Sequence, residues 1–391
     1  MHEPSTKGLK PGWHPVMHKL QYDYGTTILE AENNYGYEET VSGPFDFTYE
    51  DYHEPKLALL RQRYELDKMV EGVRTDFEKA VRIADWLAGM YKDRRIKGLP
   101  LIPSFQTPEE PGIRPRDYDA LSMLELTDDH SVHCVHLSMI MAQSCISLGI
   151  NARKVGQQKK DIDSGGYRSG HATVEIWSHE HGKWVFVDPM GDPAPHSIPA
   201  TDGCLYFHRN GAPLSLLEVH KLYRERAWDE VEIRPSAAAL ITANNEYRDY
   251  FHHIFVLLRN NWFSDPYTKE YRDPTSYKSM GREALHWVDE LSPPMIGYHN
   301  TQQEHVFNWC IDHTTIHLEF TQRLGTLRVC LNATAPNLDS FLVSLNEGRW
   351  MPRPAVFQWD VRSGTNTIRA RTRSRFGVDG PVSKVTIQHE G

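Results

Sequence analysis

Three residues in the middle of the chain have the types and spacing of a thiol catalytic triad: Cys134, His171 and Asp188. Cys134 directly precedes an apolar run, 135–148, that is closed by Gly149, which predicts a buried helix with the thiol in its first turn. There the positive end of the helix dipole and free N–H groups favour the thiolate. A neighbouring imidazole and a carboxylate that orients it would complete a nucleophile.

The spacing of His171 and Asp188 fits a β-hairpin. The strand-like runs 172–177 and 183–188 flank a short glycine-containing connection, 178–182. The midpoint between His171 and Asp188 falls inside this connection, so the two residues are expected to face each other within one residue of register. Opposed residues point to the same face of a sheet, which would bring the imidazole and the carboxylate within hydrogen-bonding reach.

Further helices and a strand are predicted around this segment. Pro55 suits the first turn of a helix that begins at Glu54, and Thr75 with Glu78 fits the capping box of a second helix. Residues 119–126 are typical of a short helical turn, and residues 151–155 of a strand.

The second half of the chain changes character near residue 293. Residues 205–290 are interpreted as mixed and largely helical, with helices over 214–228 and 237–258. Beyond them, short strand-like runs alternate with turns: 315–320, 327–331, 341–345, 356–359, 367–371 and 384–388. Regular short strands of this kind predict an immunoglobulin- or fibronectin-like β-sandwich.

Four sequence runs together resemble the core of the transglutaminase-like superfamily. They are the helix DFEKAVRIADWLAGMY, the segment CVHLSMIMAQSCISLGINARKVG that begins at Cys134, GHATVEIW with His171, and GKWVFVDP with Asp188. The resemblance covers roughly residues 75–192, and it implies a papain-like core in which helices pack on an antiparallel sheet. It also implies that Cys134 is the nucleophile, His171 the general base and acid, and Asp188 the orienting residue.

Two features depart from that pattern. His133 stands where many members of the superfamily have Gly or Gln, and no motif places a second oxyanion donor. The backbone N–H of Cys134 is the one donor we can nominate.

The expected architecture is therefore α+β, a papain- or transglutaminase-like core followed by an all-β sandwich. We expect an N-terminal arm over residues 1–53 that packs on the core, a catalytic domain over 54–292, and the sandwich over 293–391.

Four further residues are candidates for substrate binding: Tyr167, Arg168, His133 and Trp184. Tyr167 and Arg168 belong to a polar loop, 157–170, that ends at His171 and should border the cleft. His133 precedes the nucleophile. Trp184, on the second strand of the hairpin, fits either the cleft or the core.

The other histidines and cysteines favour no metal site. His130, His133 and His136 follow a spacing of three, which drifts around a helix, and neither a cysteine nor a carboxylate completes a zinc set. The remaining cysteines are scattered and fit small core residues: Cys145, Cys204, Cys310 and Cys330. We expect no metal or organic cofactor and no disulfide framework.

Composition narrows the classes of partner. The 391 residues include 43 Lys and Arg against 52 Asp and Glu, a net charge of −9, which argues against a general nucleic-acid binder. No apolar run is long enough to predict a membrane-spanning helix, and the polar first residues, without an apolar stretch, predict no signal peptide. The expected location is cytoplasmic, or secreted or periplasmic if a leader was removed. The oligomeric state is not predicted.

Three functions fit these features. The first is a thiol acyl-transfer enzyme, a hydrolase or acyltransferase for amides or peptides that forms a thioester on Cys134. The second is a carbohydrate-active enzyme, a hydrolase or a lyase that cleaves an acidic polysaccharide, with His171 or Tyr167 as base and Arg153 or Arg168 as carboxylate clamp. The third is a non-catalytic binding module. Loss of activity in Cys134→Ala would separate the first from an elimination enzyme, and the reactivity of the Cys134 thiol separates catalysis from a binding module.

Overall fold

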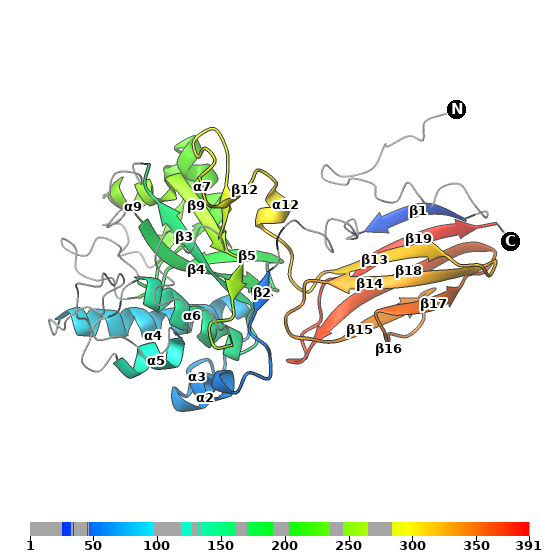
Figure 1. Ribbon diagram of the computed structural model, residues 1–391, viewed down its shortest axis with the longest axis horizontal. Coiled ribbons are helices and arrows are strands. Elements are labelled where there is room, and N and C mark those ends of the chain that lie inside the picture. Colours follow the sequence, from blue (N-terminus) through cyan, green and yellow to red (C-terminus); the bar gives the residue numbers. More distant parts are fainter. Residues whose placement is uncertain are drawn as a thin grey trace. The chain divides into compact units, whose positions relative to one another are not determined.

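The chain forms two compact units, which are described separately from a computed structural model (Figure 1). One unit is 47–309, and the other joins the segment before residue 47 to 310–391. The structure describes residues 26–32, 34, 45, 47–96, 119–126, 132, 134–160, 170–190, 203–234, 245–264 and 284–390. The units therefore divide at 46/47 and 309/310, whereas the sequence analysis placed the boundaries at 53/54 and 292/293.

A six-stranded sheet forms the centre of the 47–309 unit, in the order β12-β11-β9-β3-β4-β5. Neighbouring strands are antiparallel except for β11 and β12. The strands are β3 (Ala152–Gln158), β4 (Gly170–Ser178), β5 (Lys183–Val187), β9 (His253–Leu257), β11 (Ala284–Trp287) and β12 (His299–Thr301). This is the expected α+β architecture, with helices packed on an antiparallel sheet.

Helices cover both faces of this sheet. Figure 1 shows α4, α5 and α6 on one side of strands β3 and β4, and α7 with α9 on the other side. The helices are α2 (Pro55–Arg63), α3 (Leu66–Met69), α4 (Asp76–Ile96), α5 (Ala120–Glu125), α6 (Cys134–Ser147), α7 (Leu216–Glu225), α9 (Asn245–Asp249) and α12 (Glu304–Phe307). Among the described residues, no helix is long and apolar enough to cross a membrane.

Shorter elements complete the unit. A 3₁₀ turn, η4 (Trp228–Glu230), follows α7, and another, η6 (Tyr250–His252), directly precedes β9. The parallel pair β2 (Thr48–Tyr49) and β10 (Arg259–Asn260) lies apart from a small sheet of β6 (Tyr206–Arg209), β7 (Ala212–Pro213) and β8 (Glu232–Arg234).

Local sequence signals account for the helix ends. Pro55 is the first residue of α2, as predicted, and the Glu54 side chain accepts from the N–H of Lys56. The Thr75 hydroxyl accepts from the N–H of Glu78 at the start of α4, as expected of a capping residue. At the end of α6, Gly149 has a φ of 82°, the left-handed conformation that glycine adopts without strain.

One helix prediction was wrong. The sequence analysis extended a helix over 237–258, but His253–Leu257 is strand β9, in the middle of the sheet. All five residues are buried, so the run lacks the alternation that usually identifies a strand. Residues 237–244 lie outside the described residues.

The second unit is the predicted β-sandwich. Its two sheets have the orders β1-β19-β18-β15-β16 and β13-β14-β17. Its strands are β1 (Thr26–Glu32), β13 (Thr314–Phe320), β14 (Thr326–Ala333), β15 (Leu338–Leu345), β16 (Met351–Arg353), β17 (Val356–Asp360), β18 (Gly364–Ser374) and β19 (Ser383–His389). Apolar side chains from both sheets, including Leu318, Val329, Trp359, Ile368 and Ile387, form one core.

The described residues 26–32 and 34 belong to this sandwich rather than to the 47–309 unit. Strand β1 pairs antiparallel with β19, and Asn34 extends the contact to the other sheet. The Asn34 side chain accepts from the N–H of Ile316 at 2.7 Å and donates to its carbonyl at 3.0 Å. The prediction of an arm on the core is therefore corrected for the described residues 26–32 and 34, because their pairing groups are used by the sandwich.

Replacing Asn34 by alanine should weaken this connection. The change leaves the buried N–H and C=O of Ile316 without their side-chain partner, which typically costs about 1–3 kcal/mol. We expect faster hydrogen exchange at the Ile316 amide and a lower urea midpoint for the sandwich. Asn332→Ala on β14 is a matched control, because that side chain has no hydrogen bond among the described residues; equal effects of the two changes would contradict the expectation.

Candidate active site

Strands β4 and β5 form the predicted hairpin, with a register slightly different from the expected one. Val174 pairs with Val187 and Ser178 with Lys183, so Asp188 comes opposite Thr173 when the register is continued. His171 and Asp188 are therefore diagonal neighbours on one face, two residues from direct opposition rather than within one. Diagonal pairs remain within reach of long side chains, and these two do meet.

The carboxylate of Asp188 is fully buried and accepts three hydrogen bonds. Its Oδ2 accepts from His171 Nε2 at 2.8 Å and from the Tyr247 hydroxyl at 3.1 Å. Its Oδ1 accepts from the N–H of Met190 at 2.9 Å. The backbone of Asp188 is also paired in both directions with Leu205, so the residue is fixed by main chain and side chain together.

His171 lies between the carboxylate and the thiol. Its Nε2 is used by Asp188, which leaves Nδ1 for the Cys134 side chain. Burial alone would lower the pKa of His171, but the charge and hydrogen bond of Asp188, with a smaller contribution from Cys134, raise it to about 10. The imidazole therefore holds its second proton through the neutral pH range.

Cys134 is the first residue of α6 and is half-buried. Burial by itself would raise the pKa of the thiol. The hydrogen bond and charge of His171, together with the backbone of Ala172, outweigh burial and hold that pKa below its ordinary value. The start of a helix adds to this effect, because free N–H groups and the helix dipole also favour the thiolate.

A comparison with protein-family models identifies this segment. The model of the transglutaminase-like superfamily matches residues 65–189, about a third of the chain. Residues 65–189 are therefore similar to the transglutaminase-like superfamily. The match begins in the loop before α3, ends directly after Asp188, and contains all three residues of the Cys-His-Asp arrangement. The comparison with curated proteins gave no match.

Of the four residues predicted to bind substrate, the structure describes only Trp184. Tyr167, Arg168 and His133 lie outside the described residues. Trp184 is 1% exposed, so the prediction that it binds substrate is corrected in favour of the core. Its indole N–H donates to the Trp309 carbonyl at 2.8 Å, and its ring packs against the Arg153 guanidinium.

Arg153, considered as a carboxylate clamp, is also unavailable to a ligand. Its guanidinium is completely buried and donates to Glu175 Oε2 at 2.9 and 2.6 Å. It lies 4.1 Å from the Trp184 ring and 4.3 Å from the Trp309 ring. The other carboxylate oxygen of Glu175 accepts from the N–H of Leu216, at the start of α7. This ion pair therefore joins the sheet to α7 and to the segment before residue 310.

Sequence reasoning missed Tyr247, which lies 59 residues after Asp188. Its ring centroid is 6.1 Å from that of His171, and the ring centroid of Tyr250 is 5.9 Å from that of His171. Neither tyrosine has a motif around it, and both lie within a run that had been interpreted as one long helix. No signal in the sequence connects them to the hairpin.

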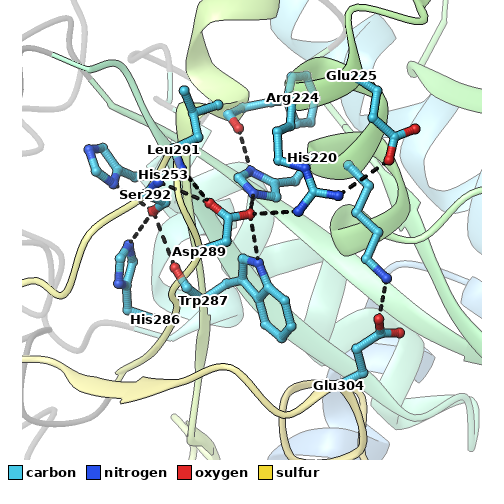
Figure 2. A network of polar contacts seen from close by, with 12 residues as sticks. His220, Arg224, Glu225, His253, His286, Trp287, Asp289, Leu291, Ser292 and Glu304 are labelled. Atoms are coloured by element: carbon cyan, nitrogen blue, oxygen red, sulfur yellow. Dashed lines mark hydrogen bonds and ion pairs between the residues drawn. The ribbon is translucent and has the colours of Figure 1, made fainter.

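A second buried polar cluster surrounds Asp289 and Ser292 (Figure 2). Asp289 accepts from His220 Nε2 at 2.8 Å, and from the N–H groups of Leu291 and Ser292. The Ser292 hydroxyl lies 2.8 Å from His253 Nδ1 and 3.0 Å from His286 Nε2. These contacts tie α7, β9 and β11 to the loop before β12.

Two histidines of this cluster, His253 and His286, are neutral at pH 7. Burial, followed by the charges of His252, His286 and His220, lowers the pKa of His253 to about 4. Burial likewise lowers the pKa of His286 to about 4. A neutral chain satisfies the geometry if His253 donates to Ser292, Ser292 donates to His286, and His286 Nδ1 donates to Asn300 Oδ1, 3.1 Å away.

Within the described part of the chain, no group of three or more His, Cys, Asp and Glu side chains is placed to hold a metal ion. His136, from the predicted row of three histidines, is buried inside α6, whereas His130 and His133 are not described.

Proposed function

We propose that this protein is a cysteine-dependent acyl-transfer enzyme that acts on amide or peptide bonds. The observation that supports it is the 2.8 Å contact between His171 Nε2 and Asp188 Oδ2, with Cys134 on the other side of the imidazole. The match of residues 65–189 to the transglutaminase-like superfamily, whose members are in general papain-like thiol enzymes, points the same way.

In the proposed reaction the Cys134 thiolate attacks the carbonyl carbon of an amide. The C–S bond forms as the carbonyl oxygen takes up negative charge, and the N–H at the start of α6 can stabilise that oxyanion. His171 then gives its proton to the departing amine as the C–N bond breaks, leaving a thioester on Cys134. Asp188 keeps the imidazole oriented and balances its charge.

The thioester is resolved by a second nucleophile. His171 takes a proton from water, and the attack of that oxygen releases a carboxylic acid, which completes hydrolysis. If an amine enters instead, a new amide forms and the reaction is a transfer. Neither route requires a metal or an organic cofactor, and we propose hydrolysis as the main outcome. The burial of Arg153 removes one support for polysaccharide elimination.

Alkylation of Cys134 by iodoacetamide across pH, read by mass spectrometry, tests the proposal. Because His171 lowers the thiol pKa, we expect the wild type to react rapidly well below the pH at which an ordinary cysteine ionises. His171→Ala should reduce the rate near pH 6 at least about tenfold, since each unit of pKa changes the thiolate fraction tenfold.

An internal control is available in the same helix. Cys145 is fully buried, and burial raises the pKa of its thiol, so it should remain unlabelled in folded protein. A slow reaction at Cys134 that does not depend on His171 would contradict a thiol mechanism. Amide and peptide libraries, followed by acidic polysaccharides, would then show which substrate class, if any, is turned over in a Cys134-dependent way.

A further inference from the structure

Tyr247 contacts the proposed catalytic apparatus from outside the segment that matches the superfamily. The match ends at residue 189, whereas Tyr247 belongs to α9, between the small β6-β7-β8 sheet and strand β9. Its hydroxyl donates to Asp188 Oδ2 at 3.1 Å, the same oxygen that accepts from His171 at 2.8 Å. One carboxylate oxygen therefore serves an imidazole and a phenol.

Packing of the Tyr247 ring against neighbouring aromatic side chains fixes the position of its hydroxyl. Tyr247 is 2% exposed. Its ring centroid lies 5.6 Å from Phe251 and 6.3 Å from Phe207, and Phe207 in turn packs against Phe186 on β5. A side chain enclosed on these sides has few rotamers, so its hydroxyl stays directed at the carboxylate.

A buried carboxylate needs donors for its lone pairs, and each donor restricts where it can point. The three donors to Asp188 come from three places in the chain: β4 through His171, the turn at Met190, and α9 through Tyr247. Without Tyr247, Oδ2 would keep only the imidazole, and a rotation of the carboxylate would carry the imidazole out of line with Cys134.

We infer that Tyr247 is a positioning residue for the proposed reaction, acting through Asp188 to fix the imidazole of His171 against the Cys134 thiol. The inference rests on the proposed function, and it adds an element, α9, that the superfamily match does not contain. Besides orienting the carboxylate, the phenol disperses its charge, because a donated hydrogen bond draws electron density from the acceptor oxygen.

Tyr247→Phe removes the hydroxyl and keeps the ring in its aromatic surroundings. We expect the Asp188 carboxylate, which then has one donor fewer, to hold the His171 proton more strongly. The far-downfield proton resonance of the His171 Nε2–H, identified by its loss in His171→Ala, should move further downfield. It should also persist to a pH about half a unit higher, because a carboxylate with fewer donors is a better proton acceptor.

Tyr250→Phe is the matched control. Tyr250 is 4% exposed and its ring is 5.9 Å from that of His171, yet its hydroxyl is not among the donors to Asp188. The resonance should stay in place in this variant. The other titratable groups that face the pair, Cys134 and Cys204, are unchanged in both variants, and thermal unfolding of each variant shows whether either ring change disturbs the fold.

The results separate the two proposals. Suppose that wild-type Cys134 is alkylated rapidly, that this rate is lost in His171→Ala, and that the His171 resonance is the same in Tyr247→Phe and wild type. The acyl-transfer proposal then stands, and Tyr247 is only a packing residue. An equal displacement in Tyr250→Phe would also overturn the inference. If wild-type Cys134 is inert, both proposals fall. Rapid labelling together with a displacement specific to Tyr247→Phe supports both.

Discussion

Replacing Glu175 by glutamine is expected to lower the free energy of unfolding by about 3–5 kcal/mol, the usual cost of removing one partner from a buried ion pair. The Arg153 guanidinium would remain buried beside an amide group, with its charge uncompensated. The Phe307 carbonyl and the Asn308 side chain, its other acceptors, are neutral and cannot replace a carboxylate.

The aromatic rings around Arg153 increase this dependence. The ring centroids of Trp184 and Trp309 lie 4.1 and 4.3 Å from the guanidinium carbon of Arg153. Because these rings cover the guanidinium and Arg153 is completely buried, water does not reach the charge. Cation–π attraction compensates only a part of the lost Coulomb energy, since each such contact contributes roughly 0.5–2 kcal/mol. Urea unfolding followed by tryptophan fluorescence would report the loss directly, because Trp184 and Trp309 are themselves the neighbours.

Glu125→Gln is the matched control for this experiment. Glu125 pairs with Arg63 at 2.7 Å, but both side chains are about half exposed, so its loss should leave the free energy of unfolding nearly unchanged. Replacing Arg153 and Glu175 together by methionine should restore much of the stability, because no charge is then left buried. Equal losses of stability in Glu175→Gln and Glu125→Gln would contradict this account of the Arg153–Glu175 ion pair.

Acidification is expected to destabilise the protein strongly between pH 6.5 and 4. His253 and His286 have pKa values of about 4 in the folded chain, against about 6.5 when unfolded. In this window the unfolded chain binds more protons than the folded one, so the free energy of unfolding falls as the pH falls. Each imidazole contributes up to about 3 kcal/mol, and most of that is lost by pH 4.

The cluster in Figure 2 explains why these two histidines resist protonation. Both side chains are buried, and their ring centroids lie 5.5 Å apart. Besides burial, the charge of His220, which contacts Asp289, lowers the pKa of both. Urea unfolding at a series of pH values would give the slope of the free energy of unfolding against pH. His286→Gln should flatten it, whereas His305→Gln, at an exposed position on α12, should leave it unchanged. A slope that is the same in all three proteins would contradict the assignment to this cluster.

Local signals predicted much of the candidate site. A helix that begins at Cys134 follows from the apolar run and its closing glycine, and the hairpin follows from two strand-like runs with a short connection. The contact of His171 with Asp188 was predictable to within two residues, because the length of a hairpin connection does not fix its register alone. In the sandwich, strands such as 315–320 and 367–371 were found because alternation and turn residues repeat at short intervals.

Features that depend on distant parts of the chain could not be predicted. Strand β9 is buried on both faces, so its residues carry no alternation. Tyr247 reaches Asp188 only because α9 folds back over the hairpin, and a single tyrosine in a polar run gives no sign of this. Strand β1 pairs with a strand more than three hundred residues later, a separation at which no local pattern carries information.

That pairing also sets an order for biosynthesis. Strand β1 is made before residues 47–309, but its partner β19 is made only after them and after the rest of the sandwich. Until β19 is made, the edge of β1 has no partner strand, whereas the unit 47–309 already has its complete sequence. Closure of the sandwich is then a late, long-range event, whose speed is limited by the search of two strands for each other across more than three hundred residues of chain.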